Sequence, residues 1–550
     1  MPDWMKLSQW AVRIETLVAF VALYVMATAN GAWWETVWGT RSLTNPANWF
    51  FVASCFIALA AVQFALIAPF ANRWTVRVLL TLVVVAAESV AQYTRLYAVI
   101  MDPAMVQNIL KTDAREAAEL FSWELVGAVL FWSLPAVFAV WWVRIAREKW
   151  LRATLIRVLS VLGAVLLAGL MLWPVSRDLT SFMRNEREAR YQITPVNLIY
   201  GLAANLGAAA SERAGPRTPL GTDAHVARAT GEMPRVLVLV VGETARAANF
   251  SLFGYTHFTN PQLAHKDILA FSDVHSCGTS TEVSVPCMFS RLGRSDYDAR
   301  AIRRSEGLLD VLSHAGYAVL WFDNQSGCKG VCQGAGIQFR KIPVNADPRL
   351  CRAGECHDEI LVKYLDAELS RVTRDTVIVL HMIGNHGPAY FRRYPPAFRL
   401  FTPDCETDQL RDCTGDEVVN AYDNAIVYTD FVLSRIVGIL SARGTALDSS
   451  MLYVSDHGES LGEGGLYLHG IPYSIAPSTQ THVPMIAWIS PARAAGGLDL
   501  GCARGRVNEK FSHDNLFDTA LGLLDVSTSV YRRERDIFAP CRTGRTPTRS

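Results

Sequence analysis

A short apolar segment of the chain ends in residues that could bind a metal ion. Residues 451–454 are apolar and indicate a buried strand, and Asp456-His457-Gly458-Glu459 follows directly. Carboxylate oxygens and imidazole nitrogens are ligands that zinc and manganese accept. Strands of an open α/β sheet present functional groups at their carboxyl ends, so this segment predicts a metal site at a strand end. An isolated Asp-His-Gly also occurs by chance, and further ligands must come from elsewhere in the chain.

Other apolar segments also end in polar residues. Four runs resemble the first one: 235–241, 317–322, 376–382 and 483–489. Helical patterns separate them, at 304–315, 359–374 and 418–443. This alternation predicts a largely parallel sheet with helices on both faces. Polar groups follow four of the five runs: Glu243, Asp323-Asn324, Asn385-His386 and Asp456-His457. Because the carboxyl ends of parallel strands share one edge of a sheet, we expect an active site at this edge.

Residues 276–290 could supply a nucleophile. A turn of small residues, from Ser276 to Thr281, leads into a predicted helix. A helix amino terminus stabilises anions, and a hydroxyl bound to a divalent cation loses its proton far below its normal pKa. The simpler interpretation is ordinary helix capping, which is the commoner role of Ser and Thr at such positions. Several hydroxyl groups share this segment, and the sequence alone does not choose among them.

The first third of the 550-residue chain predicts a membrane domain that would hold these elements at a bilayer. Five apolar segments have the length of about 20 residues that crosses a bilayer core. They cover 13–33, 50–71, 77–100, 122–143 and 153–174. Basic residues concentrate at 73–77 and 144–152, which places these loops in the cytoplasm and everything after the fifth span outside. Residues 27–29 resemble a signal-peptidase site, but Trp33-Trp34 favours a retained first span.

The cysteines agree with an exported catalytic domain. Of eleven cysteines, Cys55 lies in a predicted span and the other ten lie between positions 277 and 541. An even set in an exported domain predicts disulfides, and the spacings do not match the paired knuckles of a zinc ribbon, which is the rival interpretation. The spacings favour the pairs Cys277–Cys287, Cys328–Cys332, Cys351–Cys356 and Cys405–Cys413, and leave Cys502–Cys541. The compartment is then oxidising, which for a bacterial inner-membrane protein is the periplasm.

Composition divides the chain into three parts. Residues 1–175 form the predicted five-helix transmembrane domain, 176–234 interfacial helices and a linker, and 235–550 the periplasmic catalytic domain. The segment 176–210 mixes charged and apolar residues as interfacial helices do. By composition alone, the polar loop 101–116 is a solvated connector. The net charge of +1 gives no reason to expect a nucleic acid as a partner.

Several motifs, taken together in this order, resemble the lipid A phosphoethanolamine transferases. This family includes the mobile colistin-resistance enzymes and belongs to the alkaline phosphatase/sulfatase superfamily. The motifs are Gly242-Glu243-Thr244-Ala245-Arg246, the segment 276–290, Cys328-Lys329-Gly330-Val331-Cys332, Gly384-Asn385-His386, and 455–462 followed by His469. The resemblance covers essentially the whole chain. It implies a five-helix membrane domain followed by an alkaline phosphatase/sulfatase-like α/β sandwich with a mainly parallel sheet.

The resemblance also implies a metal centre and a nucleophile. Thr281 would be the nucleophile and would join Glu243, Asp456 and His457 around one zinc ion per catalytic domain, with a second zinc ion as the alternative. Glu459 would lie beside the metal or ligate it on occasion.

Substrate contacts are implied in the same way. Lys329, His386 and His469 would hold the phosphate and the departing or arriving oxygen, and the lipid headgroup would contact Asn108, Thr112 and Glu116. Two positions depart from the family or vary within it. Glu282 follows the nucleophile where the family usually has a small residue, and Gln325 precedes Lys329 at a variable position.

The implied activity is transfer of phosphoethanolamine from phosphatidylethanolamine to a phosphate of lipid A through a covalent threonine intermediate. It would lower the negative charge of the outer membrane and give resistance to polymyxin and cationic peptides. The partners would be membrane lipids, and we expect a monomer. The main alternative is a phosphoethanolamine or phosphoglycerol transferase that acts on another glycan or on the lipopolysaccharide core. A sulfatase is disfavoured because Met288 replaces the arginine expected after Ser284-Val285-Pro286, and an inactive scaffold or sensor is disfavoured because every candidate ligand is present.

Overall fold

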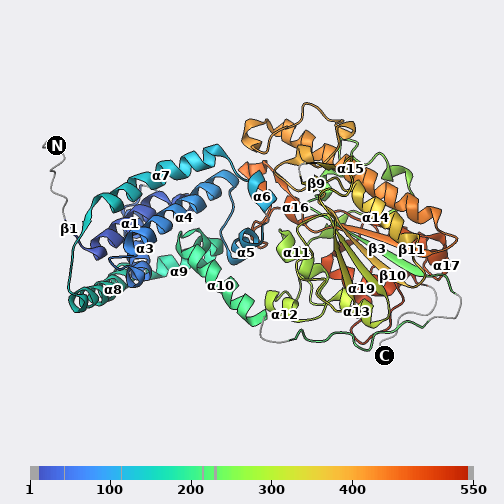
Figure 1. Ribbon diagram of the computed structural model, residues 1–550, viewed down its shortest axis with the longest axis horizontal. Helices are drawn as coiled ribbons and strands as arrows, with labels where there is room; N and C mark the ends of the chain where they lie inside the picture. The colour runs from blue at the N-terminus through green and yellow to red at the C-terminus, as the bar shows by residue number, and fades with distance from the viewer. Residues whose placement is uncertain are drawn as a thin grey trace. The chain divides into compact units, whose positions relative to one another are not determined.

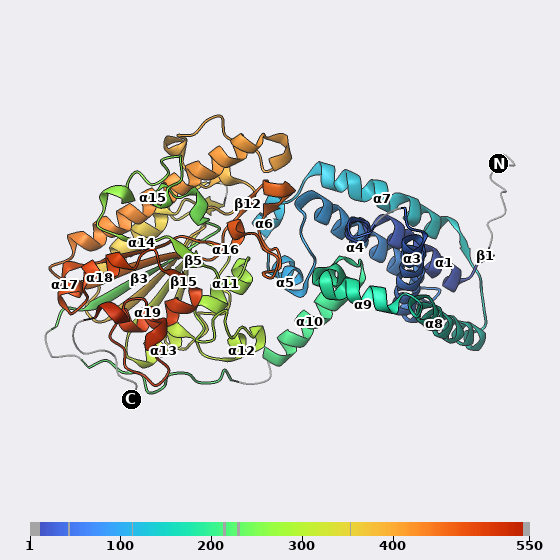
Figure 2. The same cartoon turned by 180° about the vertical axis from the view of Figure 1, so that it is seen from behind.

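The computed structural model describes residues 11–41, 44–112, 114–212, 216–227, 232–352 and 354–542. Contacts within the chain define two compact units (Figures 1 and 2). The first comprises Met1–Leu110 and Phe121–Gly207, and the second comprises Lys111–Leu120 and Ala208–Ser550. The second unit therefore includes a short segment, 111–120, from the middle of the membrane part of the sequence. The three-part division at residues 175 and 234 stays a prediction.

The first unit is helical. Its helices are α1 (Ile14–Thr28), α2 (Gly31–Gly39), α3 (Pro46–Ile67), α4 (Val76–Tyr97), α5 (Pro103–Lys111, whose last residue counts with the second unit), α7 (Trp123–Trp142), α8 (Trp150–Leu172), α9 (Ser176–Asn185) and α10 (Val196–Glu212). Within this described unit, α3 with its 3-10 extension, α4, α7 and α8 are long and apolar enough to cross a membrane, and α1 with α2 passes as a bent pair. Only 17% and 11% of the apolar windows of α7 and α8 are buried, which leaves their apolar surface for lipid.

The first predicted span, 13–33, is bent rather than straight. Helix α1 ends at Thr28 and α2 begins at Gly31, with 54° between their axes. The buried Asn30 lies at the break: its side-chain amide donates to the carbonyls of Val25 and Thr194, at 2.9 Å each, and its side-chain oxygen accepts from the Thr194 N–H at 2.8 Å. An asparagine side chain that bonds to the backbone competes with the helical hydrogen-bond ladder, which accounts for the bend.

The second unit is built on a seven-stranded sheet. The strand order is β4 (Leu269–Phe271), β14 (Met485–Ile489), β11 (Asp448–Ser455), β3 (Arg235–Gly242), β10 (Thr376–His381), β6 (Ala318–Asp323) and β7 (Ile337–Lys341). Strands β11, β3, β10, β6 and β7 run parallel. Every residue of β3 and β10 is buried, as expected for central parallel strands that are covered on both faces. The mainly parallel sheet predicted from the sequence is confirmed.

Strand β14 corrects the expectation in detail. It pairs antiparallel with both β11 and β4. A parallel return would need a crossover connection of a dozen or more residues, usually a helix. Between β11 and β14 the described chain forms only the four-residue helix α16 (Ser478–Thr481), a three-residue 3-10 helix and two short strands. Strands β4 and β7 were not predicted, because β4 has three residues and β7 is largely exposed at the sheet edge.

Helices cover both faces of this sheet. Figures 1 and 2 show α14 (Glu359–Leu369) and α15 (Gly415–Ala442) on one face, and α13 (Leu308–His314) and α19 (Leu516–Leu523) on the other. By length and hydropathy α15 would also pass as a membrane span, but 67% of its apolar window is buried within the protein. Its apolar residues belong to the core of the sandwich, so this helix is not a sixth span.

The cysteines of the second unit form five disulfides. They are Cys277–Cys287, Cys328–Cys332, Cys351–Cys356, Cys405–Cys413 and Cys502–Cys541, the pairs that the spacing predicts. Cys55, in α3 of the first unit, keeps a free thiol.

Candidate active site

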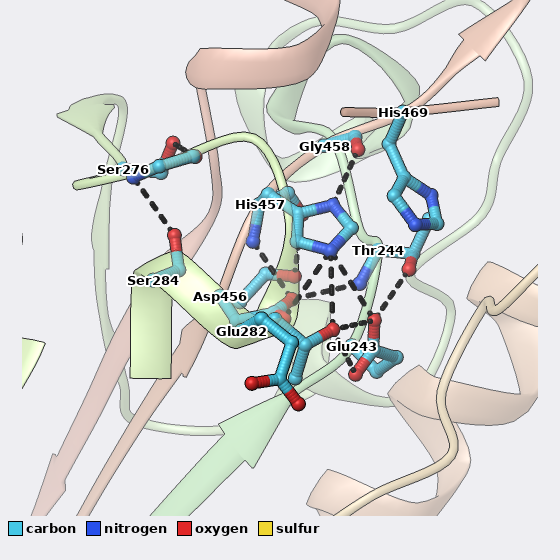
Figure 3. A network of polar contacts seen from close by, with 12 residues as sticks. Glu243, Thr244, Ser276, Glu282, Ser284, Asp456, His457, Gly458 and His469 are labelled. Atoms are coloured by element: carbon cyan, nitrogen blue, oxygen red, sulfur yellow. Dashed lines mark hydrogen bonds and ion pairs between the residues drawn. The ribbon is translucent and has the colours of Figure 1, made fainter. Parts of the chain in front are cut away.

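Three potential metal ligands meet at the carboxyl ends of two neighbouring strands. Glu243 follows β3, and Asp456 and His457 follow β11, which pairs directly with β3 up to Ser455 and Gly242. One ligand atom from each of the three side chains lies within 4.8 Å of the others, and all three residues are fully buried (Figure 3). The parallel register therefore places the acid of one strand beside the acid and the imidazole of the next.

Hydrogen bonds orient these ligands. The His457 Nδ1 lies 2.9 Å from the Gly458 carbonyl, an acceptor, so Nδ1 carries the proton and Nε2 faces the acids. Nε2 is 3.4 Å from a Glu243 oxygen and 3.3 Å from Asp456 Oδ2. Asp456 Oδ1 accepts from the backbone N–H groups of Thr244 and His457, at 3.0 and 2.7 Å. Asp456 Oδ2 is buried and has no hydrogen-bond partner among the described residues.

The charges of this cluster are unbalanced without a cation. Burial raises the pKa of Asp456, and the neighbouring Glu243 carboxylate raises it further. Burial opposes ionisation of Glu243 as well, but its hydrogen bond to His457 holds the Glu243 pKa well below its usual range. Burial alone would lower the pKa of His457, but the charge of Asp456 and the interactions with Glu243 raise it to about 10. A proton on His457 thus stands in for the positive charge that a metal would supply.

The donor set fits zinc. Two carboxylates and one imidazole nitrogen point at the same small space, and Asp456 contributes a buried oxygen without a hydrogen-bond partner in the described part of the chain. Oxygen and imidazole donors are accepted by zinc, and a catalytic zinc site keeps a further position open. Binding of the metal would displace the proton from His457, as it does when a histidine becomes a ligand.

Thr281 completes this group. It is the first residue of α11 (Thr281–Met288), and its Oγ1 lies 3.1 and 3.2 Å from the two oxygens of Glu243 and 3.4 Å from His457 Nε2. The hydroxyl therefore lies at the amino terminus of a helix and beside the potential metal ligands, where an alkoxide or a bound phosphoryl group is stabilised.

Three other hydroxyl groups of this segment already have hydrogen-bond partners. Ser276 donates to the Gly278 carbonyl at 2.6 Å, and Thr279 donates to the Ile471 carbonyl at 2.7 Å. Ser284 accepts from the Gly278 N–H at 2.9 Å. The tertiary structure thus distinguishes Thr281 from its neighbours, a choice that the sequence alone left open.

Backbone geometry allows this close arrangement. Thr244, directly after Glu243, has a φ of 58°, and its N–H donates to Asp456. Gly384, after β10, has a φ of 53°, and a Cβ atom there would lie 2.6 Å from the Glu243 carbonyl oxygen. A positive φ at a non-glycine residue is uncommon and clusters at functional sites, and only glycine fits at position 384.

Two further histidines approach the metal ligands. The ring centroid of His469 lies 4.3 Å from that of His457 and 5.7 Å from that of His386. His469 Nδ1 is 3.2 Å from an oxygen of Glu459, which is fully buried. Glu459 thus contacts His469 and is not among the three residues whose ligand atoms cluster. The His469 ring therefore lies near both His457 and His386, and the substrate role of His386 and His469 stays a prediction.

Glu282 and Lys329 form an ion pair next to the nucleophile. Glu282 is buried, its carboxylate lies 3.0 Å from Lys329 Nζ and 2.9 Å from Lys111 Nζ, and it points away from Glu243 (Figure 3). Lys329 also donates to Ser326 at 2.7 Å. The sequence indicated Glu282 as an extra charge of unknown effect, and the structure shows that two lysines compensate it.

Comparison with known proteins identifies the family. The sequence model of the protein family described as phosphoethanolamine transferase EptA/EptB matches residues 59–209. The sequence model of the sulfatase family matches residues 235–526. The phosphoethanolamine transferase EptA of Salmonella typhimurium is 36% identical over 538 residues, covering 95% of this chain and 96% of that protein. The chain belongs to the phosphoethanolamine transferases. The phosphatidylethanolamine transferase Mcr-1 of Escherichia coli is 33% identical and covers 93% of this chain and 95% of that protein.

A solved structure supports the same membership for the whole architecture. The integral membrane lipooligosaccharide phosphoethanolamine transferase A of Neisseria meningitidis superposes with a TM-score of 0.90 at 36% identity, over 96% of this chain and 99% of that one. This member of the transferase family is therefore a multi-pass membrane protein with a soluble domain of the periplasmic type.

Not every strand end of this transferase contributes to the site. Asp323 contacts the buried His381 at 2.9 Å, and the Asn324 amide donates to Asp358 at 2.8 Å. Asn385 donates to the carbonyl of Tyr422 on α15 at 3.3 Å. These groups satisfy buried polar atoms around the site and do not join the metal ligands. A strand-end position does not fix the direction of a side chain, so Asp323, Asn324 and Asn385 lie at the predicted edge without joining the ligands.

Sequence reasoning missed one direct neighbour of the metal ligands. The Gln325 amide donates to Glu243 at 2.8 Å. Its position before Lys329 was noted only as variable, and no motif links it to Glu243, which is 82 residues away in the sequence.

The predicted headgroup contacts lie on the segment around 101–116. Asn108 is a half-buried residue of α5, and Thr112 follows directly after that helix and is also half-buried. Glu116 lies on α6 (Ala114–Glu119), but its side chain is outside the described residues. The headgroup role of these three residues stays a prediction.

Proposed function

We propose that this transferase moves phosphoethanolamine from phosphatidylethanolamine to a phosphate of lipid A, through a covalent adduct on Thr281. The observation that carries the proposal is the position of the Thr281 hydroxyl between Glu243 and His457 at a helix amino terminus. Relatives named as phosphatidylethanolamine and lipid A phosphoethanolamine transferases support the donor and the acceptor.

Zinc is the metal we propose for the site, one ion per catalytic domain. Glu243, Asp456 and His457 would hold it together with Thr281. When bound, it supplies a lower pKa for the threonine hydroxyl and neutralises charge on the phosphoryl oxygens.

In the first half-reaction the Thr281 oxygen attacks the phosphorus of phosphatidylethanolamine. The bond between phosphorus and the diacylglycerol oxygen breaks, and phosphoethanolamine stays on Thr281. His469 would give a proton to the leaving oxygen, a role supported by the contact of its Nδ1 with Glu459, which leaves its other nitrogen for the substrate. Lys329 holds the phosphoryl oxygens as a cationic point charge.

In the second half-reaction a phosphate oxygen of lipid A attacks the same phosphorus. The bond to Thr281 breaks and restores the threonine oxygen, while the acceptor proton returns to the histidine that gave one up. Protons and charges therefore balance over the two steps, and the donor and acceptor use one site in turn. Each transfer would cover a phosphate charge with an ammonium group, which lowers the negative charge of the outer membrane and the affinity for polymyxin and other cationic peptides.

The adduct on Thr281 is the decisive test. Purified protein would be incubated with phosphatidylethanolamine alone, and peptides spanning 270–291 mapped by mass spectrometry. We expect one phosphoethanolamine unit on Thr281 and release of diacylglycerol, because without an acceptor only slow hydrolysis removes the adduct. Thr281→Ala should show neither, whereas the matched control Ser284→Ala should retain both.

Two results would change the proposal. Normal transfer to lipid A by Thr281→Ala, with no adduct on any residue, would replace the covalent route with direct transfer between the lipids. Adduct formation that discharges to another glycan but not to lipid A would keep the chemistry and identify a transferase for a different acceptor.

A further inference from the structure

A strongly basic cavity lies beside the nucleophile helix α11. Its volume is about 500 Å³, and Glu282 and Pro286 of α11, with Phe289 directly after this helix, form one side of it. Its cationic lining residues are Lys111, Arg217, Arg303, Arg304 and Lys329, against the two carboxylates of Glu282 and Glu306. All of these residues belong to the second compact unit. Since Glu282 directly follows Thr281, the cavity adjoins the proposed phosphoryl-transfer site.

Ion pairs within the lining leave it with a positive surplus. Glu282 is shared by Lys111 and Lys329, so two ammonium groups face one carboxylate. Arg217 is neutralised by a bidentate pair with Asp310, at 2.6 and 2.9 Å.

Glu306, the second carboxylate of the lining, also has polar partners. Glu306 accepts from the Leu220 N–H at 3.0 Å and contacts His314 at 2.8 Å. Arg304 then adds an exposed guanidinium group, and the half-buried Arg303 also lines the cavity. The summed charge of the lining favours an anion.

The arginines are held in a fixed relation to the nucleophile. Arg303 and Arg304 end helix α12 (Ala299–Arg304), and Ile302 of this helix packs in one apolar cluster with the disulfide Cys277–Cys287. That disulfide joins the turn before α11 to α11 itself. The Arg304 carbonyl further accepts from the Thr218 N–H at 2.6 Å. Helix α12 therefore has two anchors, one of them on the element that carries the nucleophile.

The two lipid substrates differ in the charge that this cavity would recognise. Phosphatidylethanolamine is a zwitterion with no net charge near neutral pH, whereas a phosphate monoester on an acceptor carries about −1.5 to −2. Guanidinium groups bind phosphate through two parallel hydrogen bonds, which an ammonium group does not. We propose that the arginine side of the basic cavity, Arg303 and Arg304, binds the phosphorylated part of the acceptor and not the donor. The proposal rests on the proposed two-step transfer and assigns its acceptor subsite.

Separate assays of the two half-reactions distinguish acceptor binding at this subsite from the transfer chemistry at Thr281. The donor half-reaction would be followed as diacylglycerol release and adduct formation on Thr281 with phosphatidylethanolamine alone. The acceptor half-reaction would be followed as discharge of the isolated adduct by lipid A in a single turnover. The variants are Arg304→Glu and the double variant Arg303→Ala/Arg304→Ala. The control is Arg300→Glu, an exposed arginine on the same helix that does not line the cavity.

We expect Arg304→Glu and the double variant to slow the acceptor half-reaction about tenfold or more, the loss typical of a charge-assisted hydrogen bond. Their donor half-reaction should stay within about twofold of the wild type, and Arg300→Glu should leave both within about twofold. Added salt should slow discharge of the wild-type adduct more than that of the variants, because the cavity charge is screened.

Other outcomes overturn the assignment. If both half-reactions slow equally, or if only the donor half-reaction slows, the cavity does not select the acceptor. Unchanged discharge in both cavity variants would mean that it binds neither substrate. If the wild type forms no adduct at all, the proposed function fails by itself, independently of the cavity.

Discussion

The two sides of helix α11 carry opposite kinds of unbalanced charge. Thr281 faces Glu243, Asp456 and His457, where two acids and one imidazole are fully buried around a small space. Its neighbour Glu282 faces a larger basic cavity in which part of the lining is exposed. Adjacent residues of a helix point about 100° apart, so one turn of α11 presents one residue to each side.

The difference shows how a single helix can separate catalysis from recognition. A rigid, buried acidic cluster needs a cation to offset the cost of its charges, which suits a tightly held metal. A wider basic cavity with flexible long side chains suits a bulky anion that must enter and leave in each cycle.

The largest expected effect is on the acidic side. Asp456→Ala or Glu243→Ala should lose bound zinc and lower transfer by about 10³-fold or more, because each removes one of few metal ligands and the charge stabilisation that depends on the metal. Lys329→Ala should lose activity but keep the metal, since the Lys329 side chain pairs with Glu282 and not with the ligand cluster. Metal analysis of the purified variants, together with transfer assays, separates the two classes. A full equivalent of zinc on active Asp456→Ala would show that the ligand set is wrong.

A smaller effect, on the stability of the soluble domain, is expected for Glu282, which follows Thr281 and faces the basic cavity. Glu282→Gln keeps the size of the side chain but leaves the ammonium of Lys329, whose side chain is only 8% exposed, without its carboxylate. Breaking a buried pair in this way should destabilise the soluble domain by about 3 kcal/mol. Lys111→Met removes the half-exposed partner and should cost less than about 1 kcal/mol.

Chemical unfolding of both variants would measure this difference. Equal stability of Glu282→Gln and the wild type would show that Glu282 does not hold the lysines together.

An effect that is smaller than that of Glu282→Gln concerns two buried histidines with opposite pKa shifts. Acids raise the pKa of His457, whereas burial lowers that of His513 from 6.5 to about 4, although His513 bonds to the Cys277 N–H and the Ser455 carbonyl. A lowered histidine pKa gives stability that is present above pH 6.5 and is lost as pH falls towards 4. Lowering the pH from 7 to 5 should therefore cost the wild type about 2 kcal/mol more than His513→Gln. Unfolding curves at both pH values measure it, and equal losses in the two proteins would contradict the assignment.

Local sequence patterns predicted the main elements of this protein and the strand ends that carry the potential metal ligands. Apolar runs of strand length and of membrane length differ enough to separate β3 or β11 from α7 or α8, because a bilayer core demands about 20 residues. Cysteine spacing predicted the five disulfides, since short loops limit the choice of partners. Polar residues directly after strands predicted where Glu243, Asp456 and His457 would lie, because parallel strands bring their ends to one edge.

Only the tertiary structure decided between residues of equal chemistry. Ser276, Thr279, Thr281 and Ser284 are interchangeable by composition, but three of these hydroxyls bond to backbone groups and one faces the acids. The bend at Asn30 depends on its bonds to Thr194, 164 residues away, and the acidic partner of Gln325 is 82 residues away. The basic cavity likewise combines residues as far apart as Lys111 and Gln333. Such contacts depend on side-chain direction and on long-range packing, and a local sequence pattern specifies neither.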